Sequence, residues 1–214
     1  MKLKLLLAAI FAGLTCSLHV EAQTNALVLD ANAPTVETIV CIRHGEKPPG
    51  GLGQLNCRGL NRALALPDVL LGKYGKPQFV FAPNTTQKVD GKIGYNYIRP
   101  LMTIEPTAIR CGLPVNTEYG YLDINGLESE LKKPEYRNAV IFVAWEHGLL
   151  DDFVKNLVKN NGGDPATVPA WPREDFDSIF LVKITHASTG DSASFTIEHE
   201  NLNGLSDECP QPHP

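Results

Sequence analysis

The chain has 214 residues, of which 43% are hydrophobic and 20% are charged, and its formal net charge is −5 at pH 7. These proportions are those of an ordinary globular domain, and they exclude an intrinsically disordered chain, a collagen-like repeat and a multi-span membrane protein. The negative charge argues against a nucleic-acid-binding protein, because such proteins neutralise phosphates with a surplus of lysine and arginine. An anionic ligand must therefore be held by a local cluster of cations.

The first residues have the features of a secretory signal peptide. Lys2 and Lys4 precede an apolar run over residues 5–14, and Val20 and Ala22 occupy the positions that signal peptidase reads. We expect cleavage after Ala22, which gives a secreted or periplasmic protein without a stable membrane anchor. An uncleaved N-terminal anchor is the alternative, although the apolar run is short for one.

Four cysteines remain after such a cleavage, namely Cys41, Cys57, Cys111 and Cys209. An even number in an oxidising compartment permits two disulfides, for which three pairings exist. Cys41 lies in an apolar run and could equally be a buried free thiol. The spacing of cysteines and histidines does not match a zinc site, so we expect no metal.

After the signal peptide at residues 1–22, residues 23–35 form a polar lead-in, residues 36–200 form one domain, and the proline-containing residues 201–214 form a loosely ordered tail. The predicted strands are residues 38–42, 78–82, 139–145, 178–185 and 194–198, with a weak strand around Val115. The predicted helices are residues 57–71, 99–110 and 149–160.

Two features mark the first helix. Asn56 is a favourable N-cap and Gly72 is expected to end the helix, while Pro67 predicts a kink or an earlier end.

The alternation of strands and helices along the whole domain predicts an α/β fold. We expect a three-layer sandwich in which a mostly parallel central sheet carries helices on both faces.

Ligands of such sheets bind where the strands end. His44 follows the first strand in the sequence Arg43-His44-Gly45, and His147 follows the strand at residues 139–145 in the sequence Glu-His-Gly. A single histidine at such a place is more often structural than catalytic. Two histidines at equivalent strand ends, one of them beside an arginine, favour a catalytic site.

A pair of histidines at such strand ends is suited to phosphoryl transfer. A neutral imidazole is a competent nucleophile towards phosphorus at neutral pH. The planar guanidinium of Arg43 matches two phosphate oxygens, and a second arginine nearby would complete the neutralisation of the phosphoryl group.

Four segments resemble the histidine phosphatase superfamily, whose fold is also called phosphoglycerate mutase-like. The matches run in order through most of the domain, from residue 36 to residue 185. They are the Arg-His-Gly signature at residues 40–46, the start of the first helix at 55–63, the segment with the second catalytic arginine at 99–106, and the strand that delivers the second histidine at 143–148.

The resemblance implies a phosphatase that hydrolyses a phosphate monoester through a phosphohistidine on His44, without metal or cofactor. Arg43, Arg99 and His147 would bind the phosphoryl oxygens, and the partner would be a small phosphorylated substrate. Two rivals remain: a protein phosphohistidine phosphatase, favoured by the compact chain, and a phosphate-binding protein that has lost turnover.

Two glutamates are candidates for the proton donor of the reaction. Glu146, adjacent to His147, is the first candidate and Glu118 is the second. Glu146 could instead be a structural partner, because successive residues of a strand face opposite sides of the sheet.

The chain also departs from the family in an insertion. Residues 84–97 separate the second strand from the helix that carries Arg99. This segment either covers the pocket and selects the substrate or forms a plain solvated loop. Lys47, directly after the His44 loop, either reaches the substrate or lies in solvent.

Overall fold

The computed structural model describes residues 33–211. The expected signal peptide at residues 1–22 lies outside the described residues, and so do most of the lead-in and residues 212–214. Within the described part, no helix combines the length and the hydropathy that crossing a membrane requires.

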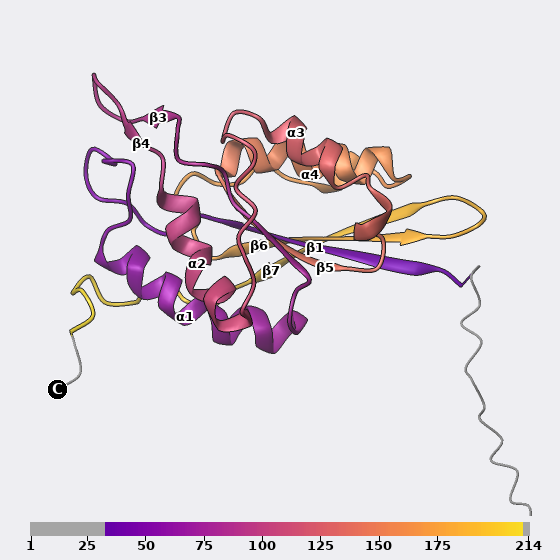
Figure 1. The fold of residues 1–214 in the computed structure, drawn as a ribbon, viewed down its shortest axis with the longest axis horizontal. Helices are drawn as coiled ribbons and strands as arrows, with labels where there is room; N and C mark the ends of the chain where they lie inside the picture. Colours follow the sequence, from indigo (N-terminus) through magenta and orange to yellow (C-terminus); the bar gives the residue numbers. More distant parts are fainter. Residues whose placement is uncertain (1–32, 212–214) are drawn as a thin grey trace, which may run out of the picture. The chain divides into compact units, whose positions relative to one another are not determined.

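A five-stranded sheet forms the centre of the domain, with the strand order β2-β5-β1-β6-β7 (Figure 1). The pairings of β1 with β5 and of β5 with β2 are parallel, whereas β6 is antiparallel to both of its neighbours. Strand β7 therefore points the same way as β1, and only β6 runs against the others. The bounds are β1 Thr35–Arg43, β2 Phe79–Phe81, β5 Val140–Trp145, β6 Ser178–His186 and β7 Ser192–His199.

Helices cover both faces of this sheet (Figure 1). Alternate residues of β1 point to opposite faces, so Val40 and Ile42 pack in one core while Ile39 and Cys41 pack in the other. The first core contains α1 (Cys57–Tyr74) and α2 (Arg99–Cys111), and the second contains α3 (Ile124–Glu130) and α4 (His147–Asn160). Two short 3₁₀ turns complete the fold, at Pro134–Tyr136 and Pro165–Thr167. The predicted three-layer α/β sandwich is confirmed.

The first helix is longer than predicted. The side chain of Asn56 accepts a hydrogen bond from the Gly59 N–H, as expected of an N-cap, but the helix passes Gly72 and ends at Tyr74, with Gly75 as its C-cap. Pro67 lies inside it and does not end it. Burial of Leu66 and Leu70 on the sheet side keeps this segment helical despite the missing N–H.

Three further segments differ from the expectation. The region around Val115 forms only a single bridge, between Phe81 and Asn116, instead of a strand. Helix α3 was not predicted, because it has only seven residues. The inserted residues 84–97 contain a small antiparallel hairpin of β3 (Lys88–Val89) and β4 (Tyr95–Asn96), so they are not a plain loop.

The C-terminal segment is fixed over α1, contrary to the loosely ordered tail that its composition predicts. Cys209 forms a disulfide with Cys57, the first residue of α1. Asn61 donates hydrogen bonds to two backbone oxygens of the segment. The other two cysteines of the described part, Cys41 and Cys111, are buried free thiols.

A buried arginine ties this segment to the rest of the domain. The fully buried Arg62 of α1 binds Glu46 through two nitrogens, at 2.8 and 3.0 Å, and Glu200 through a third, at 2.5 Å. Asp177, directly before β6, lies 3.5 Å from the same guanidinium. Arg62 thus joins the loop after β1, the start of β6 and the end of β7.

This arrangement predicts that Arg62→Met is strongly destabilising. Removing the guanidinium leaves three acidic side chains facing one another without a cation, which we expect to lower the free energy of unfolding by about 3 to 5 kcal/mol. The matched control is Arg58→Met in the same helix, whose ion pair with Asp207 is exposed; we expect it to cost less than about 1 kcal/mol. Equal losses in chemical denaturation of the two variants would contradict this assignment.

Candidate active site

The two predicted histidines leave the sheet from neighbouring strands. The parallel register pairs Arg43 at the end of β1 with Trp145 at the end of β5, and the His44 N–H donates to the Trp145 carbonyl at 3.2 Å. His44 and the Glu146–His147 dipeptide therefore follow the carboxyl ends of two adjacent parallel strands.

Two glycines bring α1 close to the loop after β1. A Cβ on Gly45 would lie 3.0 Å from the Gly59 backbone, and one on Gly59 would lie 2.3 Å from the Glu46 carbonyl oxygen. Any larger residue at Gly59 would push the helix away from the loop. The glycines that follow His44 and Asn56 in the sequence thus fix the distance between helix and loop.

His44 is almost fully buried and is held in one tautomer. Its Nδ1 lies 2.7 Å from the Gly45 carbonyl oxygen, which makes Nδ1 the donor and leaves Nε2 with its lone pair. Burial, with the charges of Arg99 and Arg43, lowers the pKa of His44 to about 3 against the opposing effect of the Gly45 bond. The imidazole is therefore neutral at neutral pH, as a nucleophile must be.

Arg43 is buried, and no carboxylate of the described part of the chain forms an ion pair with it. Its Nη1 donates to the carbonyl oxygens of Arg173, at 2.5 Å, and Asp175, at 2.8 Å. The guanidinium lies 3.9 Å from the centre of the Phe176 ring. Because its contacts are neutral oxygens and an aromatic face, the positive charge stays available for an anion.

Arg99 begins α2 and is tied to the loop after β1. The Thr103 hydroxyl accepts from the Gly45 N–H at 2.9 Å and donates to the Arg99 carbonyl at 2.8 Å. The Arg99 guanidinium contacts Asp90 of the inserted hairpin at 2.6 Å, so the insertion supplies the only acidic partner of this arginine among the described residues.

Tyr97 forms an aromatic wall between these groups. Its ring meets the His44 ring edge-on at 5.9 Å and lies 4.7 Å below the guanidinium carbon of Arg99. Tyr97 is 1% exposed, and among residues 33–211 its hydroxyl meets no hydrogen-bond partner. Burial raises its pKa, so the hydroxyl keeps its proton.

Glu146 is held by the start of α4. Its carboxylate accepts from the Leu149 N–H at 2.9 Å and lies 2.5 Å from Nδ1 of His147. Burial acts to raise the pKa of Glu146, but the hydrogen bonds from His147 and the backbone outweigh it and hold that pKa at about 2. The carboxylate is ionised and caps the helix, which disfavours it as a proton donor. It is close enough to influence the pKa of both His44 and Arg43.

Glu118, the second candidate for the acid, is exposed in the loop before α3. Its backbone bonds to Asn116 and Asn84. Among the described residues, no hydrogen bond or ion pair joins its carboxylate to His44, Arg43 or Arg99.

The structure thus places His44, Arg43 and Arg99 together, and Glu146, which contacts His147, is close enough to act on His44 and Arg43. Sequence reasoning missed the contributions of Asp90 and Tyr97. An Asp-Gly pair inside an insertion signals a turn, and Asp90 does adopt a left-handed φ of 59°, but nothing local shows that the turn reaches an arginine.

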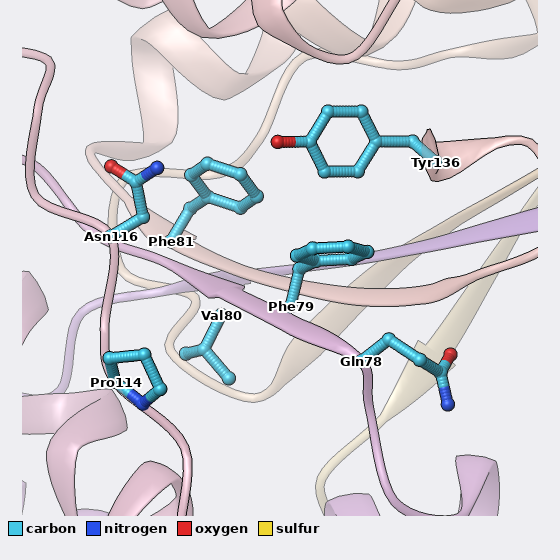
Figure 2. Close-up of a pocket in the computed structure, with 7 residues that line it drawn as sticks. All are labelled: Gln78, Phe79, Val80, Phe81, Pro114, Asn116 and Tyr136. Carbon is cyan, nitrogen blue, oxygen red and sulfur yellow. The ribbon is translucent and has the colours of Figure 1, made fainter. Parts of the chain in front are cut away.

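A separate cavity of about 350 Å³ lies against the edge strand β2 (Figure 2). The rings of Phe79, Phe81 and Tyr136 face it, and the Tyr136 hydroxyl is already bonded to Glu130. None of the predicted site residues lines this cavity, so we do not assign the reaction to it.

Comparison with known proteins identifies the fold. Neither a family model nor a curated protein sequence matches the chain. Among solved structures, a protein from Nakamurella multipartitia described as a phosphohistidine phosphatase is 16% identical, with a TM-score of 0.51 over 77% of this chain and 96% of that one.

Two further structures match equally well. A protein from Escherichia coli described as an α-ribazole-5′-P phosphatase is 14% identical, with a TM-score of 0.52 over 79% of this chain and 99% of that one. A mycobacterial glucosyl-3-phosphoglycerate phosphatase is 14% identical, with a TM-score of 0.51 over 75% of this chain and 97% of that one. At such identities the likeness establishes the architecture. The chain has the fold of these three proteins, which is the phosphoglycerate mutase-like fold that the sequence predicts.

Proposed function

We propose that this protein is a phosphatase that hydrolyses a phosphate monoester through a phosphohistidine on His44. The observation that carries the proposal is a group of buried donors without partners around a neutral imidazole: Arg43 Nε, Arg99 Nε and the Tyr97 hydroxyl. Each unsatisfied buried donor costs on the order of 1–3 kcal/mol. A phosphoryl group placed at His44 would satisfy them together.

The first step is attack of His44 Nε2 on phosphorus. A nitrogen–phosphorus bond forms, the bond to the leaving oxygen breaks, and that oxygen takes up a proton. The hydrogen bond from Nδ1 to Gly45 aims the ring and stabilises the positive charge that develops on it. Water then attacks the phosphohistidine and releases inorganic phosphate.

The two arginines stabilise the transition state. Charge spreads over the equatorial phosphoryl oxygens, and the guanidinium groups of Arg43 and Arg99 are buried close enough to His44 to act on its pKa, where water screens them little. His147 is the further donor. These charges come from the chain itself, so the proposal requires no metal ion.

A phosphate-binding protein without turnover is the second candidate. It is favoured by the ionised state of Glu146, because a site that lacks a proton donor binds phosphate but releases a leaving group slowly.

The likeness to a protein described as a phosphohistidine phosphatase makes a phosphorylated protein the alternative substrate.

We also propose that the protein is exported after cleavage behind Ala22. The disulfide between Cys57 and Cys209 supports this proposal, because such bonds persist in oxidising compartments.

The test of the nucleophile is hydrolysis of p-nitrophenyl phosphate by the mature protein in the presence of EDTA. We expect turnover in the intact protein and none above background in His44→Ala, with His199→Ala, an exposed histidine, as the control. Full activity of His44→Ala would overturn the assignment. Phosphate binding without turnover in the intact protein would favour the second candidate.

Arg99→Ala tests the stabilisation of charge in the transition state. We expect kcat to fall by about 10²-fold or more, because a buried charge next to the phosphoryl group is lost. Arg110→Ala in the same helix is the control, since its exposed ion pair with Asp68 lies outside the site. Near-normal kcat in Arg99→Ala would show that another residue carries this role.

A further inference from the structure

An open hollow of about 600 Å³ adjoins the site on the side of the inserted hairpin. Its floor is the loop after His44, in which Gly50 and Gly51 both have a φ of 76°. Asp90 and Gly91 at the tip of the hairpin form the opposite side. The remaining lining residues are Lys47, Pro48, Pro49 and Arg173.

Lining residues of the hollow contact both arginines of the proposed phosphate site. The Gly51 carbonyl accepts a hydrogen bond from Arg99 at 3.4 Å, and the Arg173 carbonyl accepts one from Arg43. Gly51 and Arg173 also line the hollow, so the hollow lies next to the groups that hold the two arginines.

The charge of this hollow is positive. Lys47 and Arg173 line it, and within residues 33–211 neither makes an ion pair with an acidic side chain. The single acidic residue of the lining, Asp90, is engaged by Arg99 at 2.6 Å and by the Gly53 N–H at 3.0 Å. Burial lowers the pKa of Lys47, and the neighbouring charge of Arg99 lowers it further, as expected of cations gathered without enough anions.

We propose that this hollow binds a second anionic group of the substrate, a carboxylate or a phosphate, through Lys47 and Arg173. The inference rests on the proposed function, and it defines the substrate class as a small phosphate ester that carries a further negative charge. The hairpin selects such substrates. Its Asp90 neutralises Arg99 only in part and leaves Lys47 and Arg173 to bind the ligand.

The test compares phosphonates, which contain an unbreakable carbon–phosphorus bond and bind whether or not the protein turns over. Isothermal titration of the mature protein is done with ethylphosphonate, 3-phosphonopropionate and ethylene-1,2-bisphosphonate. We expect a ligand with a second anion to bind about tenfold more tightly than ethylphosphonate, since an additional partly screened ion pair contributes about that factor. The carboxylate and bisphosphonate arms show which second anion is preferred.

The double variant Lys47→Gln/Arg173→Gln should reduce this preference to near unity, and Lys159→Gln, a surface lysine on α4, should retain it. Equal affinity for all three ligands in the intact protein, or a preference that survives the double variant, overturns the subsite. Hydrolysis of p-nitrophenyl phosphate by the intact protein reports separately on the proposed function.

A second observation concerns the missing proton donor. The Tyr97 hydroxyl is buried, protonated and without a partner, and its ring contacts both His44 and Arg99. The neighbouring carboxylate of Glu146 is engaged by His147 and the backbone. Tyr97 is therefore the one buried hydroxyl of the described residues that both contacts the nucleophile and has a proton to give.

We infer that Tyr97 protonates the leaving oxygen of the substrate, a role that again rests on the proposed function. As His44 bonds to phosphorus, the electron pair of the breaking bond goes to that oxygen, which takes the Tyr97 proton. The guanidinium groups of Arg99 and Arg43 stabilise the resulting phenolate. The phenolate then takes a proton from the water that attacks the phosphohistidine, which restores the hydroxyl.

Tyr97→Phe keeps the ring and removes only the hydroxyl. We expect kcat/KM to fall by about 10²-fold or more for an alkyl phosphate, whose alkoxide leaves poorly without a proton, and only a few-fold for p-nitrophenyl phosphate. Tyr121→Phe is the control, since its ring packs against Tyr97 at 4.8 Å. Equal losses for the two substrates, or no loss for either, overturn the proton-donor role. Retained hydrolysis of p-nitrophenyl phosphate shows that the nucleophilic mechanism itself stands.

Discussion

The proposed reaction needs His44 and His147 at one ligand, and this requires β1 and β5 to stay paired in a fixed register. Six residue pairs, from Thr38–Val140 to Arg43–Trp145, set that register. A slip by one residue would turn every side chain of β1 to the opposite face of the sheet, and the two cores on its faces resist such a slip. The central sheet therefore holds the reacting groups by the same contacts that stabilise the fold.

Burial of charge is the second feature of this domain. Arg62 is satisfied by acidic side chains from three segments, so it contributes to stability and to the placement of the loop after β1. Arg43 is buried equally well but contacts carbonyl oxygens and a ring. The first arrangement neutralises the cation and the second preserves it, which distinguishes a structural arginine from one suited to an anionic ligand.

Sequence reasoning predicted the elements that carry His44, Arg99 and His147, because each strand or helix has a strong local pattern and the ligand edge of an α/β sheet follows from topology. It did not predict α3, which is short, or the fixed C-terminal segment. Prolines in that segment suggested a loose tail, whereas the disulfide of Cys209 and the contacts of Glu200 come from residues far away in the chain.

The sequence by itself determined the α/β class, most of the strands and helices in their order along the chain, and the two histidines at strand ends, since apolar periodicity and strand-end motifs are local properties. Only the tertiary structure decided that Asp90 meets Arg99, that Tyr97 lies against His44, and that Lys47 and Arg173 face one hollow. These contacts join segments whose separation in space depends on chain packing, which no local pattern encodes.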